Sequence, residues 1–241
     1  MVLINLLQIF KKILKKFLFK RFYNIKFATN GMLDPILYKK FYDIGKVHKN
    51  NIFLEIGGAH GAISISVALG IKENNGHGKI IVFEKCIEGS RKKYGGYDKN
   101  FEIINNNFKK FNVANEIFLI PKLLNTETAF EAKKIIGDKN ISVLIIDADG
   151  FLHRDFSFFY NLVRDNGTII IDDYDKNKLF KKKKWITYQI VNIFFKYKLI
   201  EKKFLFKDTL FASKNKNIYW SSEIYLQCEK VILEAKKKFK K

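Results

Sequence analysis

The segment from Phe53 to Ser64 constrains the fold of this chain more than any other stretch. It begins with an apolar run, broken only by Glu55, that has the character of a buried strand. It ends in small and apolar residues at 62–69 that are typical of a helix packed on a sheet. Three glycines separate the two parts: Gly57, Gly58 and Gly61. Because glycine permits tight turns and close approach to a ligand, the segment is typical of a nucleotide-type cofactor loop, although a purely structural turn has the same pattern.

The rest of the central region alternates between expected strands and expected helices. A helix is expected to begin at Asp34 and Pro35, because Asp caps helix N-termini and Pro is favoured in the first turn. Apolar residues at helical spacing predict further helices around 101–111 and 156–162. Further strands are expected at 79–84, 117–121, 142–146 and 168–171. This alternation predicts an α/β fold with a mostly parallel sheet that helices cover on both faces.

Polar or glycine residues stand where four of these strands end. They are Gly57, Glu84, Asp147 and Asp172. In an open parallel sheet the ligand binds beyond the carboxyl ends of the strands, so we expect these residues to share one site. Glu84 is placed where a carboxylate could accept hydrogen bonds from a ribose diol, and a plain surface glutamate is the alternative.

These motifs together resemble those of class I methyltransferases that use S-adenosylmethionine (SAM). The resemblance lies in Glu55-Ile-Gly-Gly-Ala-His-Gly61, Glu84, Ile-Ile-Asp147-Ala-Asp-Gly and Asn-Gly167-Thr-Ile-Ile-Ile-Asp172-Asp-Tyr. Within that class the chain is most similar to the metal-dependent O-methyltransferases of the catechol and macrocin types. The similar region, about 31–214, implies a Rossmann-like fold with a terminal antiparallel hairpin at 199–206 and 209–213. It also implies SAM contacts from six residues: Glu55, Gly57, Gly58, Gly61, Glu84 and Asp147.

The same resemblance implies a metal site. In the similar families an acid that ends the fourth strand and an acidic pair that ends the fifth converge on magnesium, an ion that prefers hard oxygen ligands. The matching residues here are Asp147, Asp172 and Asp173. Bound to Mg²⁺, an acceptor hydroxyl would lose its proton more readily. The alternative is that Asp172 or Asp173 caps the following helix, since acids are common there.

Two residues are candidates for the general base. Asp149 matches a second acid of the macrocin-type enzymes. However, Ala148 and the missing Tyr-Glu-Ser after Asp149 depart from that type, so His153 is the alternative base. A single histidine near a site is more often structural. Met32 lies where related enzymes place a residue over the cofactor, and core packing is its alternative.

Most of the net charge of +21 lies in three segments, at 1–26, 176–184 and 230–241, while the central region is nearly balanced. Such runs are solvated faces or bind nucleic acid or an anionic membrane. In the segment 1–26 apolar residues recur at helical spacing between lysines, which predicts an amphipathic helix that lies on a membrane surface or docks on the body or on a second subunit. The lysines interrupt it too often for a membrane span.

We therefore divide the chain into a basic amphipathic helix at 1–30, a methyltransferase domain at 31–215 and a basic C-terminal helix at 216–241. Cys86 and Cys228 have no paired spacing, which is typical of reduced thiols and predicts a cytoplasmic protein, at the inner face of the membrane if 1–26 binds there.

The expected function is SAM-dependent O-methylation of a sugar or polyol-like acceptor, such as a membrane-linked glycan. One alternative is an RNA-directed methyltransferase. It is less favoured because the fourth strand ends in Asp-Ala-Asp-Gly, without the Pro-Pro motif of enzymes that methylate base nitrogens. The other is a non-catalytic binding protein on the same fold, since a fold does not guarantee chemistry.

Overall fold

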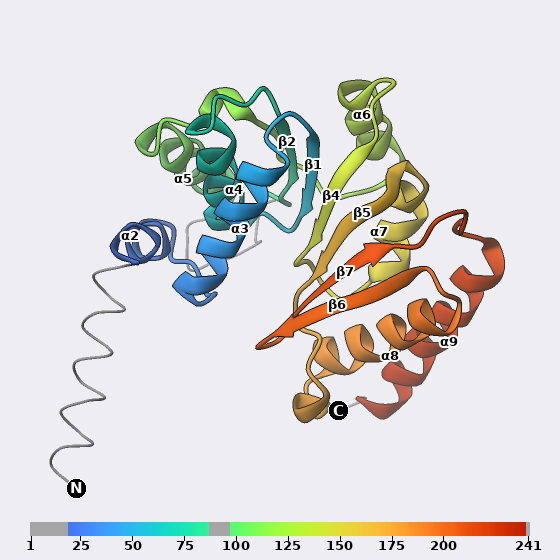
Figure 1. The fold of residues 1–241 in the computed structure, drawn as a ribbon. Helices are drawn as coiled ribbons and strands as arrows, with labels where there is room; N and C mark the ends of the chain where they lie inside the picture. The colour runs from blue at the N-terminus through green and yellow to red at the C-terminus, as the bar shows by residue number, and fades with distance from the viewer. Residues whose placement is uncertain (1–18, 87–96, 240–241) are drawn as a thin grey trace, which may run out of the picture.

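The computed structural model describes residues 19–86 and 97–239. Within them one sheet has the strand order β3-β2-β1-β4-β5-β7-β6 (Figure 1). Strands β1 to β5 are parallel, and β7 runs antiparallel to both β5 and β6. The strands are β1 (Ile52–Ile56), β2 (Lys79–Phe83), β3 (Ile117–Ile120), β4 (Ile141–Ile146), β5 (Val163–Ile171), β6 (Ile200–Phe206) and β7 (Thr209–Lys214). This confirms the predicted Rossmann-like α/β sheet with its terminal antiparallel hairpin.

The strands begin and end close to where the sequence predicts, except for β5, which begins at Val163 and not at Thr168. The pairing of β4 with β5 shifts in register between Ile141 and Val143, and Asn166 has a left-handed φ of 57°. The early part of β5 is therefore an irregular extension. Turn residues at 165–167 lie inside it, which is why the pattern predicts a turn there.

Helices cover both faces of the sheet, as predicted (Figure 1). On one face lie α2 (Lys20–Ala28), α3 (Pro35–Val47), α4 (Ala62–Lys72) and α5 (Tyr97–Lys110). On the other lie α6 (Thr126–Ile136), α7 (Leu152–Phe159), α8 (Lys182–Lys196) and α9 (Ser222–Lys238). Neighbouring strand residues serve opposite cores: Phe53 packs with the α3–α4 side and Leu54 with the α7–α9 side, and both are fully buried.

The helix that the sequence places after Asp34 is α3, and its start confirms the expected cap. Asp34 Oδ1 accepts a hydrogen bond from the backbone N–H of Ile36 at 2.9 Å, and Pro35 is the first helical residue. Helices α6 and α8 are additional to the predicted elements. Helix α6 begins with a capping box of Asn125 and Thr128. Helix α8 begins inside the lysine run, so its first residues do not show the apolar spacing by which a helix is predicted.

The two basic termini differ in what the structure describes. Most of the predicted amphipathic segment lies outside the described residues. Its continuation forms α2, whose Phe22 and Ile25 are buried in the core beside α3 and α4. At the other end, α9 packs on α7 and α8, and its Cys228 and Ile232 belong to the main core. None of the helices in 19–86 and 97–239 is long and apolar enough to cross a membrane.

Candidate functional site

The glycine loop after β1 lies between the ends of β2 and β4. The backbone N–H groups of Gly57 and Gly58 both donate to Phe83 O, at 2.9 and 3.1 Å. Gly57 has a φ of 95°, and a Cβ at this position would lie 2.2 Å from Asp147 O. A side chain at Gly57 would therefore collide with the end of β4 and adopt a strained backbone.

Two of the predicted cofactor residues are buried carboxylates beside this loop. Glu55 accepts a short hydrogen bond from Ser64 Oγ on α4, and burial raises its pKa to about 7. Glu84, directly after β2, accepts from the backbone N–H of Ala59 through Oε2 at 2.6 Å. Both carboxylates thus hold the loop in place in addition to lining cavities next to it.

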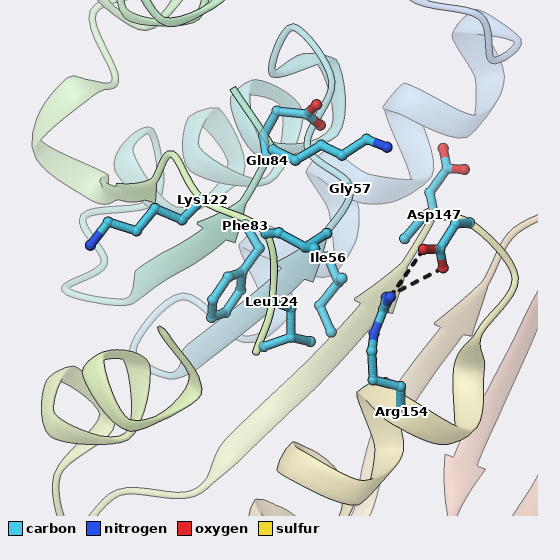
Figure 2. A pocket seen from close by; sticks show the side chains of 12 residues that line it. Ile56, Gly57, Phe83, Glu84, Lys122, Leu124, Asp147 and Arg154 are labelled. Carbon is cyan, nitrogen blue, oxygen red and sulfur yellow. Dashed lines mark hydrogen bonds and ion pairs between the residues drawn. The ribbon is translucent and has the colours of Figure 1, made fainter. Parts of the chain in front are cut away.

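Two cavities meet at the loop, and both are lined by Gly57 and Asp147. Figure 2 shows the first, with Gly57 between Glu84 and Asp147, and with the apolar side chains of Phe83 and Leu124 on its wall. The second lies toward the connection between α2 and α3. It is lined there by Met32, whose side chain is 80% exposed, so the alternative of core packing for Met32 is wrong.

Gly61, the third glycine, takes no part in lining either cavity. Its φ is 88°, and a Cβ there would lie 2.5 Å from Phe108 Cε1 on α5. Gly61 therefore allows α4 to begin close to α5, and the other glycines, Gly57 and Gly58, border the cavities.

The three predicted metal ligands come together at the ends of β4 and β5. Oxygen atoms of Asp147, Asp172 and Asp173 all lie within 4.8 Å of one another. Neither Asp172 nor Asp173 caps the next helical turn, because the cap of η4 (Lys176–Lys178) is Asp175, which accepts from Asn177 N at 2.9 Å. The capping alternative is therefore wrong, and the donor set of three carboxylates fits a hard divalent cation such as Mg²⁺.

The surroundings of the three carboxylates shift their pKa values in different directions. Burial, and then the charge of Asp172, raises the pKa of Asp147, and burial likewise raises that of Asp172, which accepts from Thr209 Oγ1 at 2.6 Å. Burial also acts on Asp173, but the hydrogen bonds and charges of Lys183 and Lys184 outweigh it, so its pKa is lowered. Asp173 has a left-handed φ of 61°, a strained conformation that these two lysines hold in place.

Lys183 and Lys184 are two site residues that the sequence does not predict. Lys183 Nζ lies 2.6 Å from Asp173 Oδ2 and 3.4 Å from Asp147 Oδ1. Lys184 Nζ lies 3.2 Å from Asp173 Oδ1 and forms a short contact with Asp208 at the tip of the β6–β7 hairpin. Their only signal in the sequence is the run of four lysines at 181–184, which gives no indication of which two face inward.

The two candidate bases lie in different places. Asp149 lines the first cavity and pairs with Arg154 at 3.0 Å, an ion pair that the sequence does not predict. His153 is buried, lines neither cavity, and places Nε2 2.8 Å from Glu229 Oε1 on α9. Burial lowers the pKa of His153 despite this neighbour. The structure thus brings Asp149, and not His153, to the cavity beside the loop.

No protein-family model and no curated protein sequence matches the chain. Solved structures do resemble it. The O-methyltransferase from Bacillus cereus in complex with SAH is 15% identical, with a TM-score of 0.59 over 82% of this chain and 90% of that one.

A SAH-bound methyltransferase from Podospora anserina is 14% identical, with a TM-score of 0.59 over 77% and 80% of the two chains. The O-methyltransferase TomG from Streptomyces achromogenes, in complex with SAM, is 12% identical, with a TM-score of 0.57 over 80% and 89%. The chain therefore has the fold of class I SAM-dependent methyltransferases, which confirms the fold that the motifs imply.

Proposed function

We propose that this chain is a SAM-dependent methyltransferase that methylates an oxygen atom of a sugar or other polyol-like acceptor. The observation that carries the proposal is the pair of cavities that meet at Gly57 and Asp147, next to a cluster of three carboxylates. Both features lie at the carboxyl ends of the parallel strands, which is where ligands bind in open α/β sheets. The fold shared with SAM-bound and SAH-bound O-methyltransferases supports the same conclusion.

The residues around the loop fit the cofactor. Gly57 leaves open the space that any side chain would fill, so the backbone can approach a ligand closely. Phe83 and Leu124 offer an apolar wall suited to the adenine ring, and Glu84 is a carboxylate of the kind that holds a ribose diol. SAM, when bound, supplies an electrophilic methyl group on a positively charged sulfur.

The carboxylates next to the cofactor cavities would serve the acceptor. Asp147, Asp172 and Asp173 would hold Mg²⁺, which favours the ionised form of a bound hydroxyl. Asp149 lines the cavity and is our candidate general base, with Arg154 holding its carboxylate in place. His153 is the second candidate, and Asp149 is favoured over it because His153 lines neither cavity and its Nε2 faces Glu229 on α9.

We further propose that the acceptor is linked to a membrane. The support is the basic and apolar pattern of residues 1–26, a pattern typical of helices that lie on anionic membrane surfaces. A small soluble polyol is the alternative acceptor. Membrane-linked glycans are favoured because such a segment would hold the enzyme close to them.

The test is transfer of a labelled methyl group. The full chain is incubated with SAM labelled at the methyl carbon and with glycan, lipid and RNA fractions of cells that lack the gene. We expect label in the glycan or glycolipid fraction. Label in RNA, together with binding that weakens steeply with salt, would replace this proposal by the RNA-directed alternative. SAM binding without transfer to any fraction would favour the non-catalytic alternative.

A further inference from the structure

The side chain of Lys183 lies among the three carboxylates. Its Nζ is 2.6 Å from Asp173 Oδ2 and 3.4 Å from Asp147 Oδ1. It thus contacts two of the three groups that a divalent ion would need as ligands, and Asp172 is the third. A lysine ammonium and a metal ion cannot share these oxygens, since both carry positive charge and both require close contact with them.

Packing around Lys183 holds it at this position. Gly150, in the loop after β4, has a φ of 91°, and a Cβ there would lie 3.4 Å from Lys183 Cγ. The loop therefore runs directly over the aliphatic part of the lysine. The next residue, Lys184, is largely buried and ties the start of α8 to Asp173 and Asp208. The start of α8 is thus fixed at two carboxylates, with Lys183 directed at the cluster.

Lys182 provides an internal comparison in the same helix. It is exposed, and no ion pair joins it to the described acids, although it stands directly before Lys183 in the sequence. The contact of Lys183 with the cluster is therefore a result of its place on α8 and not of the local density of lysines.

We propose that Lys183 is the resident cation of the Asp147, Asp172 and Asp173 cluster and competes with a divalent ion for it. This inference rests on the proposed metal site. A tethered ammonium acts at a high effective concentration, so an ion from solution binds only when Lys183 moves away from two carboxylates. The metal affinity of this site is therefore set by Lys183 as well as by the three ligands.

The competition can be measured without any activity assay. Mn²⁺ serves as the probe, titrated into the full chain by calorimetry and by electron paramagnetic resonance. We expect Lys183→Met to bind Mn²⁺ at least about tenfold more tightly than wild type, since the competing cation and its ion pairs with Asp173 and Asp147 are removed. Lys182→Met should bind Mn²⁺ as wild type does. Unchanged or weaker binding by a folded Lys183→Met protein would overturn the proposal.

Two further variants locate the effect. Lys183→Arg keeps a cation and should bind Mn²⁺ as weakly as wild type, whereas tight binding by this variant would contradict the competition. Adding Asp172→Asn to Lys183→Met should remove the gained affinity, because Asp172 is a ligand of the same site. Retention of the tight binding would place the ion elsewhere and overturn the proposal. If Lys183→Met does not fold, Lys183→Gln takes its place with the same expected result.

SAM binding, measured on the same samples, separates this inference from the proposed function. If wild-type protein binds SAM but Lys183→Met binds Mn²⁺ no more tightly than wild type, the competition by Lys183 is refuted and the proposed function is not. Folded wild-type protein that fails to bind SAM would refute the proposed function.

Discussion

The glycine loop after β1 and the carboxylate cluster after β4 and β5 lie side by side but are built in different ways. The loop is made of backbone: Gly57 and Gly58 donate to Phe83 O, and a side chain at Gly57 would collide with Asp147 O. The cluster is made of charged side chains, with Lys183 from α8 reaching carboxylates on two strand ends. The loop therefore depends on packing, and the cluster depends on charge balance.

This difference implies that the two regions respond differently to their surroundings. A steric conflict in the loop is independent of salt and pH. The cluster brings together acids whose mutual repulsion is offset by Lys183 and Lys184, so its stability follows the ionisation of those groups. Variants in each region, compared under changing pH and salt, test this difference.

The largest effect is expected in the loop, for Gly57→Ala. We expect a loss of about 2 to 5 kcal/mol in the free energy of unfolding, because a positive φ costs about 1–2 kcal/mol and overpacking about 1–3 kcal/mol. Gly137→Ala is the matched control, since Gly137 also has a positive φ but nothing lies within 4 Å of its Cβ position. Urea unfolding of both variants at two salt concentrations measures the difference. Equal losses for both would show that the contact with β4 is unimportant.

The next effect is expected in the cluster, for Lys184→Met. Lys184 contacts Asp173, Asp175 and Asp208. After its removal Asp173 keeps its ion pair with Lys183, and the other two acids keep the more exposed Lys178. We expect a loss of about 2 to 3 kcal/mol at neutral pH, less than for a fully buried pair because Asp208 is partly exposed. Lys182→Met should stay within about 0.5 kcal/mol of wild type.

The effect of Lys184→Met should also depend on pH. The lysines lower the pKa of Asp173 and Asp208, so they contribute stability above the ordinary carboxyl pKa, and that contribution is lost as the pH falls through the lowered values. Urea unfolding from neutral to acidic pH should show the variant and wild type converging. A gap that is the same at every pH would mean that packing, and not charge, is what Lys184 provides.

Glu55, one of the two buried carboxylates beside the loop, gives an effect of the opposite sign. Burial raises the pKa of Glu55 to about 7 from 4.5, so folding becomes less favourable as the pH rises between these values. We expect Glu55→Gln to be more stable than wild type above pH 7, by up to about 3 kcal/mol, and equal to it at acidic pH. Denaturant unfolding across this range is the measurement, and a constant difference would contradict the assignment.

The smallest effect is expected at the rim, for Asp34→Ala. Asp34 caps α3 through Ile36 N and pairs with Lys207 at 2.5 Å. Loss of the cap should cost about 1 kcal/mol, and the exposed pair adds little. Lys207→Ala removes the pair but keeps the cap, so thermal unfolding should show almost no change for it. A larger loss for Lys207→Ala than for Asp34→Ala would reverse this ranking.

The sequence was sufficient for most of the fold and for the loop, because both depend on local pattern. An apolar run followed by Gly57 and Gly58 predicts a strand and a tight turn from neighbouring residues alone. Asp147 and Asp172 could also be placed, since the carboxyl ends of parallel strands meet at one edge.

The partners of the carboxylates could not be predicted in the same way. Lys183, which contacts Asp147, stands 36 positions later in the chain, on α8. The position of Arg154 next to Asp149 depends on how α7 packs. The lysine run at 181–184 does not indicate which of its side chains face the carboxylates, because the packing of α8 determines this. Helix α6 was missed for a related reason, as its capping box uses Thr128 and not an acid.

The most direct test of the central claim is a calorimetric titration of the full chain with SAM. Wild-type protein and the Gly137→Ala control should both bind SAM in the micromolar range. Gly57→Arg should not bind it, provided that circular dichroism shows this variant to be folded, because its side chain fills the space at the loop. Absence of binding by folded wild type at high micromolar SAM, or equal binding by folded Gly57→Arg, would contradict the account.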